Sequence, residues 1–162
     1  MLRAASQLQT EAKAFLPCPQ DRGAIRRWIT AAQEKAQDAE NVTVSTGTRF
    51  EAIYDATFNI ALVVLNASGW RRRAVQGHHG LVLEAACAAI GAGEAMFDKL
   101  DAVRDMRNQK YDGIARTDAD LVEAKKLFHA QHSSRGVASE RTRRAAQMMA
   151  TPGAALAHSS GI

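Results

Sequence analysis

The segment that decides the fold is Thr48–Ala67, with the sequence TRFEAIYDATFNIALVVLNA. Apolar residues recur at helical spacing on both sides of this segment. One side carries Phe50, Tyr54, Phe58, Ala61, Leu62 and Leu65, and the other carries Ile53, Thr57, Ile60 and Val64. A helix that is apolar on both sides has to be covered on both. We therefore expect it at the centre of a helical bundle, with Thr46 or Thr48 as its N-cap.

Shorter helices are predicted on both sides of this segment. The pattern favours helices over about 1–16, 21–39 and 80–90, from Glu94 to about Gly113, and from Thr117 or Asp118 onward, and Asp21 is a suitable N-cap for the second of them. Only 3 prolines and 11 glycines occur, whereas strong helix formers are frequent. The sequence therefore predicts an all-α fold.

Length and charge suggest one core with less ordered ends. A chain of 162 residues with 46% hydrophobic residues can bury one core. We divide it into an N-terminal segment (1–20), the bundle (21–132) and a basic, partly disordered tail (133–162), in which 139–150 are expected to form an exposed helix. The net charge of +4 comes largely from four arginines in that tail. Overall charge is thus weak evidence for nucleic-acid binding by the bundle.

Several functional classes are not favoured. Cys18 and Cys87 lack CxxC spacing, and the adjacent His78 and His79 diverge with no completing ligands, so neither a metal site nor a cofactor is expected. One of the two histidines is expected to cap or hydrogen-bond the start of the next helix. The longest apolar run, Ile60–Leu65, is far below the ~20 residues of a membrane span. We expect a cytoplasmic protein with no membrane contact.

Two arginines lie on the apolar side of the helix predicted from Glu94. At 100° per residue, Arg104, Arg107 and Tyr111 share a stripe with Phe97 and Leu100. A guanidinium stays charged and is costly to bury alone, so each arginine needs a carboxylate, a partner subunit or a phosphate. Glu51 and Asp55, which border one apolar side of the central helix, are the predicted carboxylates.

A second basic cluster, Trp70-Arg71-Arg72-Arg73, is expected in a loop after the central helix. The indole offers a stacking surface and the guanidiniums offer charge, as at a phosphate- or RNA-binding rim. The alternative is a solvated loop whose tryptophan packs on the bundle.

The order of these features resembles a HEPN domain, the superfamily of higher eukaryotes and prokaryotes nucleotide-binding proteins. The resemblance covers about 22–131 and is strongest over 48–112. It is closest to a bacterial branch with an Arg-x-x-Arg-Asn-x-x-x-Tyr ending. The matching features are the central helix from Arg49 to Ala56 and on to Leu65, the exit Gly69-Trp70-Arg71, the turn Gly77-His78-His79, and Arg104 to Asn108 with Tyr111.

The resemblance implies a four- to five-helix up-down bundle and a homodimer whose Arg-polar motifs face each other across a cleft. In nuclease members a histidine follows that motif and RNA is cleaved without metal, the arginine stabilising phosphorane charge and the histidine moving a proton. Arg107-Asn108 matches the first half, but no histidine follows within 109–115. Neither Lys110 nor Tyr111 has an ordinary pKa near neutrality.

We therefore predict a module that binds RNA, other nucleic acid or a nucleotide, in a toxin–antitoxin or phage-defence setting with a cognate antitoxin or other protein partner. The alternatives are a ribonuclease that uses Arg107 with Tyr111 or Lys110, and a protein–protein adaptor in which the arginines are only structural. The candidate catalytic residues are Arg107, Asn108 and Tyr111, and the candidate nucleic-acid-binding residues are Trp70, Arg71, Arg72, Arg73, Arg104 and Lys110.

Overall fold

The computed structural model describes the backbone of residues 1–150 and the side chains of 1–110, 112–134 and 136. The fold is built mainly from helices, which confirms the all-α prediction. In chain order the elements are α1 (Ala5–Ala12), β1 (Phe15–Pro17), α2 (Arg22–Asp38), α3 (Thr46–Ala67), β2 (Trp70–Arg72), α4 (His78–Ile90), α5 (Glu94–Asn108), the 3-10 helix η1 (Gln109–Asp112) and α6 (Asp118–Ala150).

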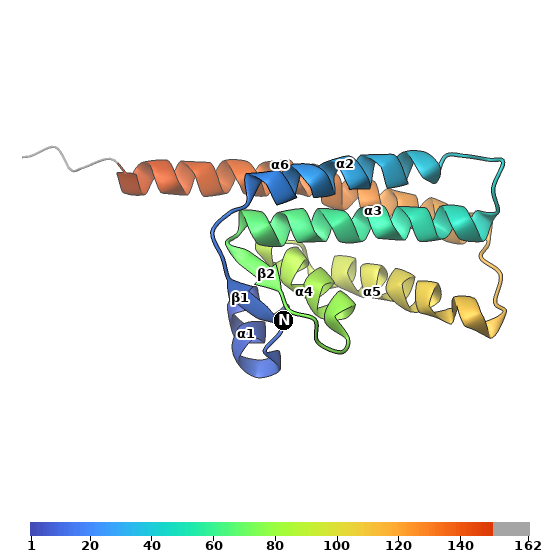
Figure 1. The fold of residues 1–162 in the computed structure, drawn as a ribbon, viewed down its shortest axis with the longest axis horizontal. Coiled ribbons are helices and arrows are strands. Elements are labelled where there is room, and N and C mark those ends of the chain that lie inside the picture. The colour runs from blue at the N-terminus through green and yellow to red at the C-terminus, as the bar shows by residue number, and fades with distance from the viewer. Residues whose placement is uncertain (151–162) are drawn as a thin grey trace, which may run out of the picture.

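Helix α3 is the centre of the bundle, as its two apolar sides predicted. It packs against α2, α4, α5 and α6. Figure 1 shows α2 and α6 beside α3, with α4 and α5 along another side, and α2 and α5 running opposite to α3 and α6. The N-cap is Ser45 and neither predicted threonine, because the Ser45 side chain accepts a hydrogen bond from the backbone N–H of Thr48. Asp21 caps α2 as expected, accepting from Ala24 N–H.

α3 is also the one helix among the described residues that is long and apolar enough to cross a bilayer by length and composition. Most of its apolar window is buried inside the bundle, as in the core helix of a folded domain.

Residues expected to form a loop are instead a strand. β1 and β2 pair antiparallel, with Phe15 opposite Arg72 and Pro17 opposite Trp70. Flanking backbone hydrogen bonds, from Cys18 N to the Gly69 carbonyl (2.9 Å) and from Arg73 N to the Ala14 carbonyl (2.7 Å), extend the pairing. The loop expectation was therefore wrong for Trp70–Arg72, because the pairing that makes them a strand joins segments more than fifty residues apart.

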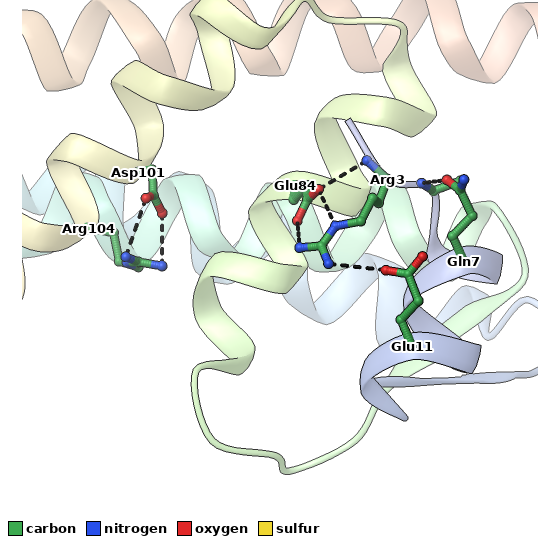
Figure 2. Close-up of polar contacts among 7 residues, drawn as sticks. Arg3, Gln7, Glu11, Glu84, Asp101 and Arg104 are labelled. Atoms are coloured by element: carbon green, nitrogen blue, oxygen red, sulfur yellow. Dashed lines mark hydrogen bonds and ion pairs between the residues drawn. The ribbon is translucent and has the colours of Figure 1, made fainter. Parts of the chain in front are cut away.

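A part-buried ion pair joins the N-terminal segment to α4 (Figure 2). The Glu84 carboxylate accepts from Arg3 Nε (2.9 Å) and Nη2 (2.8 Å), and also from the Arg3 backbone N–H (3.0 Å). The Glu84 side chain is only 9% exposed, whereas that of Arg3 is 42% exposed. Burial alone would raise the pKa of Glu84, but the hydrogen bonds from Arg3 lower it below its ordinary value.

Helix α4 begins at His78, two residues before the predicted start. His78 Nδ1 lies 2.9 Å from the carbonyl oxygen of Val75, which confirms that one of the two histidines hydrogen-bonds at the start of this helix. Cys87 is a buried free thiol in α4, and burial raises its pKa to about 11.

Helix α6 runs without a break from Asp118 to Ala150, where two separate helices were expected. Figure 1 shows it continuing past the ends of its neighbours. The expected disorder of 151–162 falls outside the described residues, as do the side chains of the tail arginines.

Candidate functional site

The site is centred on Arg107, near the C-terminal end of α5. Its guanidinium carbon lies 5.5 Å from the centroid of the Tyr54 ring on α3, a cation–π distance. The Arg107 side chain is half-buried, and its Nε is shielded from solvent with no hydrogen-bond partner in the described chain. Among the described residues, no carboxylate forms an ion pair with Arg107. A half-buried guanidinium of this kind can still bind an external anion.

Arg104 is paired within its own helix and not with α3. Its Nη1 lies 2.8 Å from Asp101 Oδ1 and its Nη2 lies 2.8 Å from Asp105 Oδ1. Figure 2 shows the Asp101–Arg104 contact along α5. The guanidinium also lies over Gly80 of α4, so close that a Cβ there would be 2.0 Å from Nη1. The glycine therefore provides the space that Arg104 occupies.

The predicted pairing of these arginines with Glu51 and Asp55 is therefore wrong. Glu51 pairs with Lys110 instead, at 3.3 Å. Asp55 makes no ion pair within the described part of the chain, although the charge of Arg107 acts on it. Burial raises the pKa of Asp55, and the positive charge of Arg107 reduces that rise.

Aromatic rings from α3 and α4 meet beside Arg107. The Tyr54 hydroxyl lies 2.9 Å from His79 Nδ1, and the His79 ring stacks on Phe58 at a centroid distance of 4.1 Å and an interplanar angle of 17°. His78 meets His79 edge-on, at 4.6 Å and 69°. Tyr54 is fully buried, whereas Phe58, His78 and His79 are half-buried. From the sequence, Phe58 was predicted to lie in the core and His79 had no predicted role at the site.

Charges from three elements converge on His79. Burial lowers the pKa of His79 to about 4, and the neighbouring His78 and the positive charges of Arg107, Arg72 and Arg104 add to that effect. His79 is therefore neutral at pH 7. Arg72 of β2 and both α5 arginines thus act on His79 through their positive charge.

Burial also raises the pKa of Tyr54 to about 12, in spite of the nearby Arg107 and Arg104. Its hydroxyl thus stays protonated at neutral pH, and the Tyr54–His79 contact joins two uncharged groups.

Arg107 also lines a cavity of about 400 Å³. It is lined by the first turn of α3 (45–48), by Phe50 and Glu51, and by the basic residues Arg107, Lys110 and Arg116. Arg116, which the sequence analysis did not select, lies over the Phe50 ring at 5.9 Å. Backbone N–H groups and the positive end of the helix dipole face outward at a helix N-terminus, so the lining favours an anion.

The predicted basic cluster at Trp70 lies on β2 and directly after it. Arg71, Arg72 and Arg73 are exposed and Trp70 is half-buried against the core. Side chains alternate along a strand, so Trp70 and Arg72 share one face of β2 and Arg71 lies on the other.

Asn108 is the exposed last residue of α5. Tyr111 lies in η1, and its side chain is outside those described.

Within the described residues, no three His, Cys, Asp or Glu side chains gather closely enough to hold a metal ion. Comparisons with known protein families, with curated proteins and with solved structures find no match to this chain. The HEPN resemblance therefore rests on the residues quoted for it.

Proposed function

We propose that this chain is a HEPN-like, homodimeric module that binds RNA, other nucleic acid or a nucleotide through its phosphate groups. The observation that carries the proposal is the cavity beside Arg107, where three basic side chains and the first turn of α3 face one space. A volume of about 400 Å³ lies within the range of small-molecule sites.

Charge supports an anionic ligand. Glu51 pairs with Lys110, while Arg107 and Arg116 make no ion pair with a carboxylate of the described residues. A phosphate would supply the negative charge with which Arg107 is not paired. A guanidinium over an aromatic ring is also held in a fixed orientation, so little conformational freedom is lost on binding.

Salt-dependent binding tests the proposal. Fluorescence anisotropy of a labelled single-stranded RNA hexamer should give an affinity that falls steeply between about 50 and 200 mM salt. Arg107→Ala should lower the affinity by about tenfold or more, as expected for a lost charge-assisted hydrogen bond, and reduce the salt slope by about 0.7.

The matched control is Arg26→Ala, which removes the same charge from an exposed position on α2. This control should bind as wild type does. An absence of binding by wild type at low salt would refute the proposal and favour a protein–protein adaptor.

The dimer is a separate part of the proposal. Sedimentation velocity at micromolar concentration should give twice the mass of the chain. A monomer would remove the shared cleft that the resemblance implies, while the cavity of one chain would remain to be tested by anisotropy.

The ribonuclease alternative uses Arg107 with Tyr111 or Lys110, whose ordinary pKa values lie far from neutrality. Binding is favoured over it because the missing proton carrier is not supplied by His79. This is the one histidine that the described structure brings to Arg107, through Tyr54. General acid–base catalysis works best with a pKa near the working pH, and the pKa of about 4 at His79 is far from neutrality. Labelled RNA incubated with the protein at pH 7, with or without chelator, should remain intact. Cleavage that Arg107→Ala abolishes would favour the ribonuclease.

The toxin–antitoxin or phage-defence setting, with a cognate antitoxin or other protein partner, is proposed from the resemblance alone. Co-purification of the protein with a product of an adjacent gene would test it.

A further inference from the structure

A patch of three aromatic rings lies next to the proposed phosphate cavity. Phe58 of α3 and His78 and His79 of α4 are all half-buried, so part of this ring cluster faces solvent. The rings are mutually ordered, with Phe58 and His79 nearly parallel and His78 edge-on to His79. We call this group the ring patch.

Tyr54 connects the ring patch to Arg107, which lines the cavity. Tyr54 contacts both groups, because it lies under Arg107 and hydrogen-bonds to His79. Along α3, the ten residue steps from Thr48 to Phe58 span about 15 Å at the helical rise. That length equals about four nucleotides at the 3.4 Å spacing of a stacked strand.

The charge around the ring patch selects the kind of ligand. Arg72, Arg104 and Arg107 all act on His79. A cationic ligand such as a methylated ammonium, which aromatic groups also bind, would be repelled there. A planar group attached to an anionic backbone is complementary to both the rings and the arginines.

We propose that the ring patch stacks an unpaired base of single-stranded nucleic acid while a phosphate about four nucleotides along the same strand occupies the cavity beside Arg107. This inference rests on the proposed function and narrows its ligand to a single strand of about four nucleotides or more. A base paired in a duplex has both faces covered by its neighbours, whereas an unpaired base can turn onto protein rings. Stacking on rings tolerates any base, so little sequence preference is expected.

The test compares ligands and variants by anisotropy. Wild type should bind the single-stranded hexamer more tightly than a duplex of the same sequence, and a mononucleotide should bind more weakly than the hexamer. Phe58→Leu keeps an apolar side chain and removes the ring, so it should weaken hexamer binding by about 5- to 150-fold. Because no charge is removed, the salt slope should stay at the wild-type value.

The matched control is Phe97→Leu, which removes another half-buried phenylalanine, from α5. It should bind the hexamer as wild type does. A thermal melt of both variants shows whether each is folded.

A second measurement uses wild type alone and does not depend on the folding of a variant. During a hexamer titration, the His79 Cε1–H proton resonance should move upfield, because a stacked base adds a ring current. The resonance is assigned in wild type from its through-space contacts with the stacked Phe58 ring.

The outcomes separate this inference from the function on which it rests. If no ligand binds wild type, both fail. If Arg107→Ala weakens hexamer binding but Phe58→Leu does not, or if the duplex binds as tightly as the hexamer, the ring patch inference is overturned and phosphate binding stands.

Discussion

Removing the Arg3 guanidinium leaves the Glu84 carboxylate buried without its charged partner. Loss of one member of a fully buried pair costs about 3–5 kcal/mol. Here Glu84 is 9% exposed but Arg3 is 42% exposed, and the backbone N–H of residue 3 still donates to Glu84 in Arg3→Ala. We therefore expect a loss of about 2–3 kcal/mol at pH 7. For a chain of this size that lowers the Tm by about 4–12 °C.

Urea denaturation followed by circular dichroism measures this loss, with Arg26→Ala as the control for removal of an arginine. In a Glu84→Leu background, Arg3→Ala should cost less than about 0.5 kcal/mol, because the remaining contact of Arg3 is an exposed pair with Glu11. The pairing lowers the pKa of Glu84 in the folded state. Its stabilising effect is therefore complete above the pKa of the unfolded state and is lost as the pH falls through the lower pKa of the folded state. The difference between wild type and Arg3→Ala should thus shrink below about pH 4. Equal melting of Arg3→Ala and Arg26→Ala at pH 7 would refute the reasoning.

Three further predictions follow from other buried groups. Gly80→Ala should displace Arg104 without loss of fold stability, since alanine favours a helix by about 1 kcal/mol over glycine. RNA affinity should then fall as far as in Arg104→Ala. Unchanged RNA affinity would show that the position of Arg104 does not matter for binding. Asp55→Asn should melt at or above the wild-type temperature at pH 7, because burial raises the pKa of Asp55 and its charged form costs stability above that pKa. A large drop in the melting temperature would instead show that the Asp55 carboxylate has a charged partner. Cys87 should resist a thiol reagent at pH 8 until the protein unfolds, while half-buried Cys18 reacts first; mass spectrometry of the labelled peptides decides this.

Local patterns predicted the helices but not the contacts that join distant segments. The two apolar sides of Thr48–Ala67 identified the central helix, and the Asp21 cap followed from a rule that acts over three residues. The β1–β2 pair could not be found in this way, since Phe15–Pro17 is too short to show a strand period. The Arg3–Glu84 pair likewise depends on how α1 meets α4, which no local pattern encodes.

The same limit applies to the site. Helical periodicity correctly placed Arg104 and Arg107 on a partly buried face, but it could not choose between carboxylates on different helices. Asp101, three residues before Arg104, has the helical spacing that favours an ion pair, and this spacing is visible in the sequence. The spacing of Tyr54 and Phe58, four residues apart, predicted that they share a face. Nothing in the sequence indicated that His79 would complete that group.

Tyr54 has a consequence for how ligands at the two ends of the site affect each other. Its ring supports Arg107 and its hydroxyl meets His79, so one buried side chain is shared by the cavity and the ring patch. If occupation of the cavity repositions this tyrosine, the affinity of the rings for a base changes, and thermodynamic linkage requires the reciprocal effect to be equal in size. Tyr54→Phe, which removes only the hydroxyl, would then leave two sites that fill independently.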